Sequence, residues 1–409
     1  MIKKITSKAG FASVMSSVSA IVVGLLVGII IIVVSNPSQA MSGIGAMLFG
    51  AFGDMKNTGQ IFYFATPIIL TGLSVGFANK TGLFNIGGPG QFIVGAYVAV
   101  LVGVKLTLPP ALEWSHWIIA ILCAAIAGAI WGTVPGILKA YYNVNEVITC
   151  IMMNYIGMYL VNYLVKLTVF DNLRNQSLMV KSSAVIPKMG LNKIFSSGMT
   201  SSSVNAGIFI AIIMGIIVHI VLSKTKFGFE LKACGYNRDA SKYAGINENK
   251  SIVLSMVIAG ALCGIGGALL YLAGSGKGIE VVDVLAVEGF NGIPVSLLGL
   301  NNPIGIIFSG IFIAYLTVGG STMQLYGFVP QVIEIITSVI IYFSAFSLLI
   351  KGFIQSRAKN DEKNNANADK AVEELNSAAI SQMADTTSND IQQNIAEGME
   401  SQEKEGGND

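Results

Sequence analysis

Long apolar stretches recur along the whole of this 409-residue sequence, separated by short polar segments. Because a helix rises 1.5 Å per residue, about 20 apolar residues are enough to cross the roughly 30 Å hydrocarbon core of a bilayer. The pattern therefore predicts an all-α membrane protein with about ten transmembrane helices. The predicted spans are residues 12–34, 60–78, 91–108, 116–140, 146–168, 204–223, 250–273, 285–300, 303–320 and 330–350.

The composition agrees with a chain that is embedded in lipid. Only 12% of the residues are charged, whereas about a quarter are charged in a typical soluble domain. The 46 glycines suit membrane helices, in which small residues let backbones approach closely. Basic residues lie mainly in the loops between apolar runs, which indicates loops retained in the cytoplasm and argues against nucleic-acid binding.

The two ends of the chain are read differently. The apolar run 18–34 is longer than the core of a signal peptide, so we predict a retained anchor whose lysine-rich flank is cytoplasmic. Ten spans then place both termini in the cytoplasm. The outer segment 171–203 nevertheless holds four basic residues, against the usual excess of Lys and Arg in cytoplasmic loops. Residues 1–354 are expected to form the membrane domain. Residues 355–409, with twelve acidic and five basic residues, are expected to form a disordered cytoplasmic tail.

Two glycine-rich segments interrupt the apolar pattern. Residues 82–87 read Gly-Leu-Phe-Asn-Ile-Gly and residues 289–294 read Gly-Phe-Asn-Gly-Ile-Pro. Glycine and proline predict broken or re-entrant helices there, and such backbone is tolerated at membrane depth only where protein or a water-filled cavity satisfies it. Five spans on each side of the 171–203 loop are compatible with a five-plus-five inverted repeat, and equally with two halves that share no repeat.

Polar side chains near these breaks are the candidates for a solute pathway. Asn85 and Gln91 offer neutral donors and acceptors that suit sugar hydroxyls or base edges, with an ordinary cytoplasmic turn as the alternative. Glu146 and Asn154 lie eight residues apart on one side of the same predicted helix. A role for Glu146 at the helix start, as a cap or against the helix dipole, is the alternative. Asn291 lies in the second glycine-rich segment.

The sequence predicts no metal site and no catalytic constellation. The four cysteines are widely spaced and there are only two histidines. The run 274–278 looks like a phosphate loop, but Tyr271 stands where the first glycine is required and Gly278 where Ser or Thr is required. We therefore expect the chain to bind no cofactor and to have no ATPase site of its own.

The polar segment 224–250 is the most informative part of the chain. Gly235 is expected to interrupt a first short helix, and Asn237 or Asp239 to cap a second one. Gly245 suits the left-handed turn that ends the second helix. We predict two short amphipathic helices on the cytoplasmic face, and composition alone leaves an ordinary charged loop as the alternative.

This segment resembles the coupling loop of bacterial ABC importer permeases of the simple-sugar, branched-chain amino acid and nucleoside group. The matching residues are Thr225, Phe227, Gly228, Glu230, Leu231, Ala233, Gly235, Asn237, Ala240, Tyr243, Ala244, Gly245 and Ile246. Further fragments resemble the nucleoside branch, so that the resemblance covers about residues 60–350. These fragments are residues 65–78, 81–91, 135–140, 144–149, 153–156 and 290–299.

The resemblance implies a permease of the plasma or inner membrane, without chemistry of its own, in an ATP-driven importer. The implied partners are cytoplasmic ABC ATPase subunits that hydrolyse the ATP, a second permease subunit, identical or homologous, and an extracytoplasmic solute-binding protein or lipoprotein. The residues implied to dock onto the ATPases are Glu230, Gly235, Asn237, Ala240, Tyr243 and Gly245.

Nucleosides are the solute that the resemblance favours, with simple sugars or branched-chain amino acids as alternatives. Two other classes of protein remain, an ion-coupled secondary transporter and a membrane-embedded enzyme. The first would usually need ionisable groups deep inside the spans, and the second would need catalytic residues.

Overall fold

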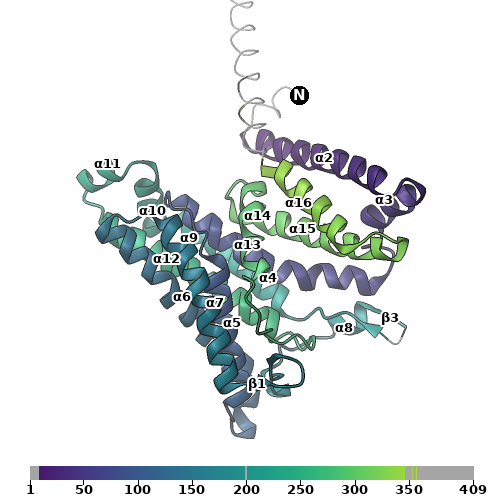
Figure 1. Cartoon of the computed structure of the whole chain (residues 1–409). Coiled ribbons are helices and arrows are strands. Elements are labelled where there is room, and N and C mark those ends of the chain that lie inside the picture. The colour runs from purple at the N-terminus through teal and green to yellow at the C-terminus, as the bar shows by residue number, and fades with distance from the viewer. Residues whose placement is uncertain (1–8, 199, 346–351, 353–355, 357–409) are drawn as a thin grey trace, which may run out of the picture. The chain divides into compact units, whose positions relative to one another are not determined.

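The apolar stretches of the sequence form long α-helices in the computed structural model of this chain (Figure 1). The residues that the structure describes are 9–198, 200–345, 352 and 356. Several helices begin where a polar side chain accepts a backbone N–H of the first turn, as Asp54, Asn145 and Asn302 do. Such a cap supplies a hydrogen bond that the helix itself cannot make.

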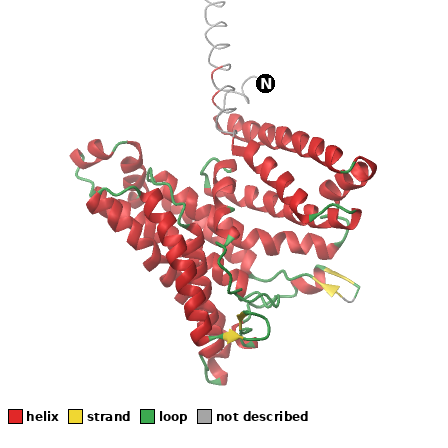
Figure 2. Ribbon diagram, viewed as in Figure 1, coloured by secondary structure: helices red, strands yellow, loops and turns green. Residues whose placement is uncertain are grey.

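Helices dominate the described part of the chain (Figure 2). The longer ones are α2 (Ala9–Ser35), α3 (Ala40–Phe49), α4 (Met55–Lys80), α5 (Gly88–Lys105), α6 (His116–Tyr142), α7 (Glu146–Thr168), α9 (Gly207–Lys224), α10 (Lys226–Tyr236), α12 (Glu248–Tyr271), α15 (Pro303–Met323) and α16 (Pro330–Ala345). The short ones are α8 (Leu191–Ile194), α11 (Arg238–Tyr243), α13 (Val287–Phe290) and α14 (Gly292–Leu298). Two antiparallel hairpins pair β1 (Phe170–Asp171) with β2 (Gln176–Ser177) and β3 (Ser196–Ser197) with β4 (Thr200–Ser201).

Seven helices of the described residues are long and apolar enough to cross a membrane. They are α4, α5, α6, α7, α9, α12 and α15, each at a predicted span. The chain is therefore a multi-pass membrane protein, but the predicted number of ten spans is not confirmed. The described apolar part of α2 is the shorter stretch Ile21–Ser35, and α16 ends at Ala345 within the described residues.

The predicted span 285–300 forms two short helices, α13 and α14, in place of one long helix. Asn291 stands between them, as the glycine-rich sequence predicts. The inverted repeat stays a prediction. The predicted tail, residues 355–409, lies outside the described residues apart from Ser356.

Helices α4 and α12 form the centre of the fold. In the most apolar window of α4, 89% of the residues are buried, and in that of α12 72% are buried. In contrast, only 28% are buried in α6 and 33% in α7 and in α9. Helices α5 and α6 pack on α12, and α15 packs on α4 (Figure 1). The exposed faces of α6, α7 and α9 are therefore the surfaces that meet lipid or a partner.

Glycines allow α6 and α12 to approach each other closely. A Cβ atom on Gly260 would lie 2.2 Å from the carbonyl oxygen of Gly128, and one on Gly264 would lie 2.3 Å from that of Ala124. Any larger side chain at these positions would push the two backbones apart. This is the packing that small residues permit between membrane helices.

The segment between α7 and α9 is anchored to the chain that follows α12. The Ser177 amide donates to the Ile279 carbonyl at 2.8 Å, and the Ile186 amide donates to the Leu272 carbonyl at 2.9 Å. Ile186 is fully buried. These bonds fix the otherwise irregular segment 171–203 on the helix ends.

Candidate functional site

Two buried carboxamides hold the irregular chain that leads into α5. The Asn85 amide nitrogen donates to Ser74 Oγ at 3.1 Å and to Gln91 Oε1 at 2.9 Å. In return, the Gln91 amide nitrogen and the Gly87 backbone N–H donate to Asn85 Oδ1, at 3.2 and 3.1 Å. Asn85 and Gln91 are buried, so these bonds replace the water that the polar atoms have lost.

A third carboxamide, that of Asn154 in α7, binds the same turn. The Gly90 backbone N–H donates to Asn154 Oδ1 at 2.9 Å, and Asn154 Nδ2 donates to the Ile86 carbonyl at 3.0 Å. Asn154 is buried. One side chain therefore satisfies a free donor and a free acceptor of the broken helix and ties α7 to the start of α5.

The structure thus brings together three of the predicted pathway residues, Asn85, Gln91 and Asn154. Their hydrogen bonds go to one another, to the Ser74 side chain and to the backbone of this chain. Contact of these residues with a solute stays a prediction. Sequence reasoning did not single out Ser74, and the signal was a serine in the middle of an apolar span.

The other two pathway candidates lie at element ends. Glu146 is the first residue of α7 and forms an ion pair with Lys139 of α6, with Lys139 Nζ 2.9 Å from Glu146 Oε2. Opposite charges on either side of a short helix connection are the signal that could have identified Lys139. Asn291 is half-buried at the junction of α13 and α14.

The second glycine-rich segment lies directly against Gly88 and Pro89, which follow the first one. A Cβ atom on Gly289 would be 2.4 Å from the Pro89 nitrogen, and one on Gly88 would be 2.6 Å from the Gly289 carbonyl oxygen. Gly292 approaches α4 in the same way, since its Cβ would be 2.5 Å from the Thr71 carbonyl oxygen. Glycine is needed here because backbone meets backbone.

The segment 224–250 forms two short helices, α10 and α11, as predicted. Thr225 accepts the Gly228 N–H at 3.0 Å and caps α10. Asn237 accepts the Ala240 N–H at 2.9 Å and caps α11. Gly245 follows α11 with φ +80°, the left-handed conformation that favours glycine. The expected interruption at Gly235 is wrong, because α10 continues through it to Tyr236.

Gly235 has a packing role instead. A Cβ atom on this residue would lie 2.5 Å from the Lys80 carbonyl oxygen and 2.9 Å from the Gly82 nitrogen. The second helix is tied to α12, where Arg238 Nε lies 3.3 Å from Glu248 Oε2. The two short helices are therefore braced against the ends of α4 and α12.

The outer side of this element carries exposed aromatic residues. Tyr236 is 91% exposed and Tyr243 is 94% exposed. Ala240 and Ala244 are exposed as well, whereas Glu230 is half-buried. We name Tyr236, Ala240, Tyr243 and Ala244 the docking face. Exposed rings on a braced element suit a contact with a partner protein, in which tyrosines are enriched.

The described residues contain no group of three or more His, Cys, Asp or Glu side chains that could hold a metal ion.

Comparison with known proteins identifies the family. Residues 57–345 match the family described as the permease component of the branched-chain amino acid transport system. No solved structure matches the chain.

Among curated relatives, the guanosine ABC transporter permease protein NupP of Bacillus subtilis is 38% identical over 84% of this chain and 96% of its own length. The nucleoside ABC transporter permease protein NupB of Lactococcus lactis is 35% identical over 81% of this chain and 90% of its own length. The glucose ABC transporter permease protein TsgB13 of Haloferax volcanii is 30% identical over 86% of this chain and 92% of its own length. The chain is therefore an ABC transporter permease and belongs to the family of branched-chain amino acid transport system permease components.

Proposed function

We propose that this chain is the permease subunit of an ATP-driven importer of nucleosides. The observation that supports it most directly is the similarity to nucleoside and guanosine permeases over more than four-fifths of the chain. The buried carboxamides of Asn85, Gln91 and Asn154 are consistent with a neutral solute, since they supply uncharged donors and acceptors at a helix break. We keep these three residues, with Glu146 and Asn291, as pathway candidates.

The chain works by binding its solute differently in two conformations, and the ATP is hydrolysed by separate subunits. The docking face receives the cytoplasmic ABC ATPases, because its tyrosines are exposed on an element that is braced by Gly235 and Arg238. Glu230, Asn237 and Gly245 support this element. The remaining partners are a second permease subunit and an extracytoplasmic solute-binding protein or lipoprotein. Both termini lie in the cytoplasm, and the chain itself binds neither a cofactor nor ATP.

A sugar importer is the second candidate. The relative from Haloferax volcanii, described as a glucose permease, favours it at 30% identity. Branched-chain amino acids follow from the family description alone.

The experiment that decides the solute is a competition panel against uptake of labelled guanosine by cells that produce the complete importer. We expect unlabelled nucleosides to compete, whereas glucose, ribose and leucine do not. Cells that lack this chain serve as the control. Uptake that is blocked by glucose or leucine and not by nucleosides would contradict the proposed solute.

A further inference from the structure

Helix α7 exposes a face whose chemistry differs from that of the other outer helices. The exposed positions of α6 between His116 and Ala140 are aliphatic, namely Leu122, Ile126, Ile130, Val134 and Ile137. The exposed positions in the body of α9 are Phe209, Ile213, Ile216, Ile217 and Ile220. Such faces suit lipid. On α7, however, Tyr155, Tyr159 and Tyr163 are exposed at intervals of four residues, and we name them the tyrosine stripe.

The tyrosine stripe occupies one side of the exposed face of α7. At about 100° per residue, the stripe together with Asn162 and Lys166 covers about 100° of the helix circumference. Ile156, Leu160 and Leu167 fall on the adjoining ~40°. From Tyr155 to Leu167 the exposed surface of α7 is therefore divided into a polar aromatic part and an aliphatic part. In the first two turns of the helix the aromatic side is continued by apolar residues, Ile148 and Met152, which are 57% and 63% exposed.

The position of the tyrosine stripe along the helix axis also argues against contact of this face with lipid. Tyr155 and Tyr159 lie within about 3 Å, along the axis, of the middle of the 23-residue helix. Tyrosines that face lipid gather at the membrane–water interface, where the hydroxyl group stays hydrated. A hydroxyl group at mid-membrane needs water, protein or solute as its partner.

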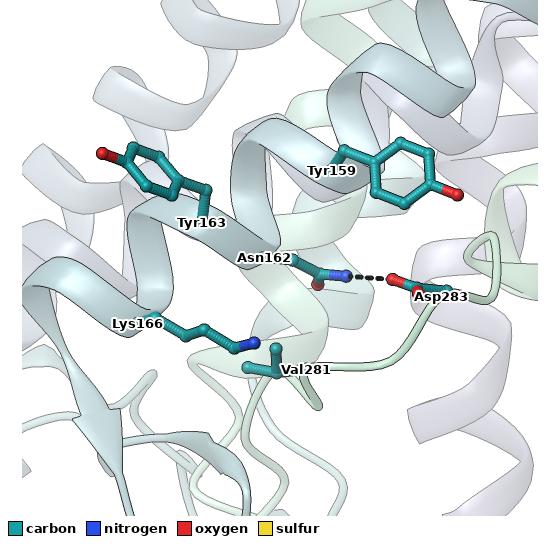
Figure 3. Close-up of a pocket in the computed structure, with 6 residues that line it drawn as sticks. All are labelled: Tyr159, Asn162, Tyr163, Lys166, Val281 and Asp283. Carbon is teal, nitrogen blue, oxygen red and sulfur yellow. Dashed lines mark hydrogen bonds between the residues drawn. The ribbon is translucent and has the colours of Figure 1, made fainter.

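A cavity of about 360 Å³ lies at this face (Figure 3). It is lined by Tyr159, Asn162, Tyr163, Lys166, Val281 and Asp283. Asn162 Nδ2 donates to the Val282 carbonyl at 2.9 Å and to Asp283 Oδ1 at 3.3 Å. The volume falls at the lower end of the range of small-ligand pockets.

We propose that this cavity, together with the tyrosine stripe, contacts the solute and takes the planar base of a nucleoside. The inference rests on the proposed function and adds to it the residues that contact the base. The ring of Tyr159, on the side of Asp283 in Figure 3, offers a stacking surface, which suits any base because every base has a π-face. The Tyr163 ring points to the other side of the pocket (Figure 3). Both donor bonds of the Asn162 amide go to the 282–283 segment. Its oxygen and the Asp283 carboxylate can therefore accept N–H or O–H groups of the base and the ribose.

The alternatives differ in which groups they use. A zwitterionic amino acid would use Lys166 and Asp283 and would gain little from a row of aromatic rings. A second permease subunit that covers the stripe would exclude both water and solute from it. The experiment separates these cases from base stacking.

The test uses single cysteines in the complete importer, in right-side-out membrane vesicles. The background is Cys123→Ala, because the other three cysteines are buried. The variants Tyr159→Cys and Tyr163→Cys are treated with a membrane-impermeant methanethiosulfonate, with and without guanosine. Leu160→Cys is the control, since Leu160 is exposed on the aliphatic part of α7 at the depth of Tyr159.

We expect both tyrosine positions to react, guanosine to slow the reaction severalfold, leucine and glucose to leave its rate unchanged, and Leu160→Cys to stay unlabelled. Failure of both tyrosine positions to react would overturn the proposal in favour of lipid or a partner subunit. Equal rates with and without guanosine, or protection by leucine or glucose alone, would overturn it as well.

Uptake measurements distinguish failure of this inference from failure of the proposed function. If the wild-type importer transports no nucleoside, the proposed function fails and the inference fails with it. If the wild type transports guanosine, Tyr159→Leu should reduce uptake about tenfold through loss of stacking, and Tyr159→Phe, which keeps the ring, should reduce it much less. Equal uptake by wild type and Tyr159→Leu would overturn the inference and leave the proposed function intact.

Discussion

A single side chain that satisfies the backbone at a helix break has a large effect on stability, because its hydrogen bonds are buried. Asn154 satisfies the Gly90 N–H and the Ile86 carbonyl at once. Asn154→Ala leaves both unpaired, and each buried unpaired group costs about 1–3 kcal/mol. We expect a lower melting temperature of the purified permease in detergent, together with reduced uptake.

The matched control for Asn154→Ala is Asn172→Ala at an exposed position, which should leave the melting temperature unchanged. An unchanged melting temperature of Asn154→Ala with loss of uptake would mean that Asn154 serves the solute and not the fold. Unchanged melting and unchanged uptake would contradict both roles.

The sequence singled out Asn85 and Gln91 as polar residues at a glycine-rich break, and Asn154 as a polar residue on the same side of a predicted helix as Glu146. It did not predict which atoms they bind. The partners are Ser74 of α4 and, at the start of α5, Ile86 and Gly90, and only the packing of α4, α5 and α7 brings them to these side chains.

At the scale of elements, α10 and α11 provide a test that leaves the fold intact. Tyr236 and Tyr243 are almost fully exposed, so Tyr236→Ser with Tyr243→Ser removes contact area without disturbing the core. We expect severalfold less ATPase subunit to co-purify with the tagged permease. Leu325→Ser, at a position that is 84% exposed, is the control and should retain the ATPase. Equal recovery of the ATPase subunit with both variants would contradict the proposal that the docking face contacts the ATPases.

The contact between α6 and α12 makes a second prediction at this scale. Gly260→Val places methyl groups where even a Cβ would lie 2.2 Å from the Gly128 carbonyl oxygen. We expect at least a several-degree fall in melting temperature, because overpacking of this kind typically costs about 1–3 kcal/mol. Gly45→Val in α3 meets no atom within 4 Å and should melt like the wild type. Equal melting of the two variants would contradict the close packing.

The sequence predicted the positions of these elements better than their details. Apolar runs located seven spans, and the cap residue Asn237 located α11, since both signals are local. The helix through Gly235 was not foreseen, because a glycine that is selected for close packing against Lys80 and Gly82 looks like a helix breaker. The tyrosine stripe was also missed, although its spacing of four residues is visible in the sequence.

For the whole molecule, the direction of the chain through the membrane can be tested. One membrane span, α9, separates Leu173 from Lys226, so the two residues should lie on opposite sides. In the Cys123→Ala background, we expect an impermeant thiol reagent to label Leu173→Cys from outside and Lys226→Cys only after permeabilisation. The reverse pattern would put the docking face outside the cell, where no cytoplasmic ATPase can reach it.

The most direct test of the account is the energy source of guanosine uptake by cells that contain the complete importer. Uptake is measured after ATP depletion and, separately, after an uncoupler has collapsed the ion gradients while ATP is maintained. The account predicts that ATP depletion abolishes uptake and that the uncoupler leaves it nearly unchanged. Uptake that survives ATP depletion and collapses with the uncoupler would contradict the account and identify an ion-coupled transporter.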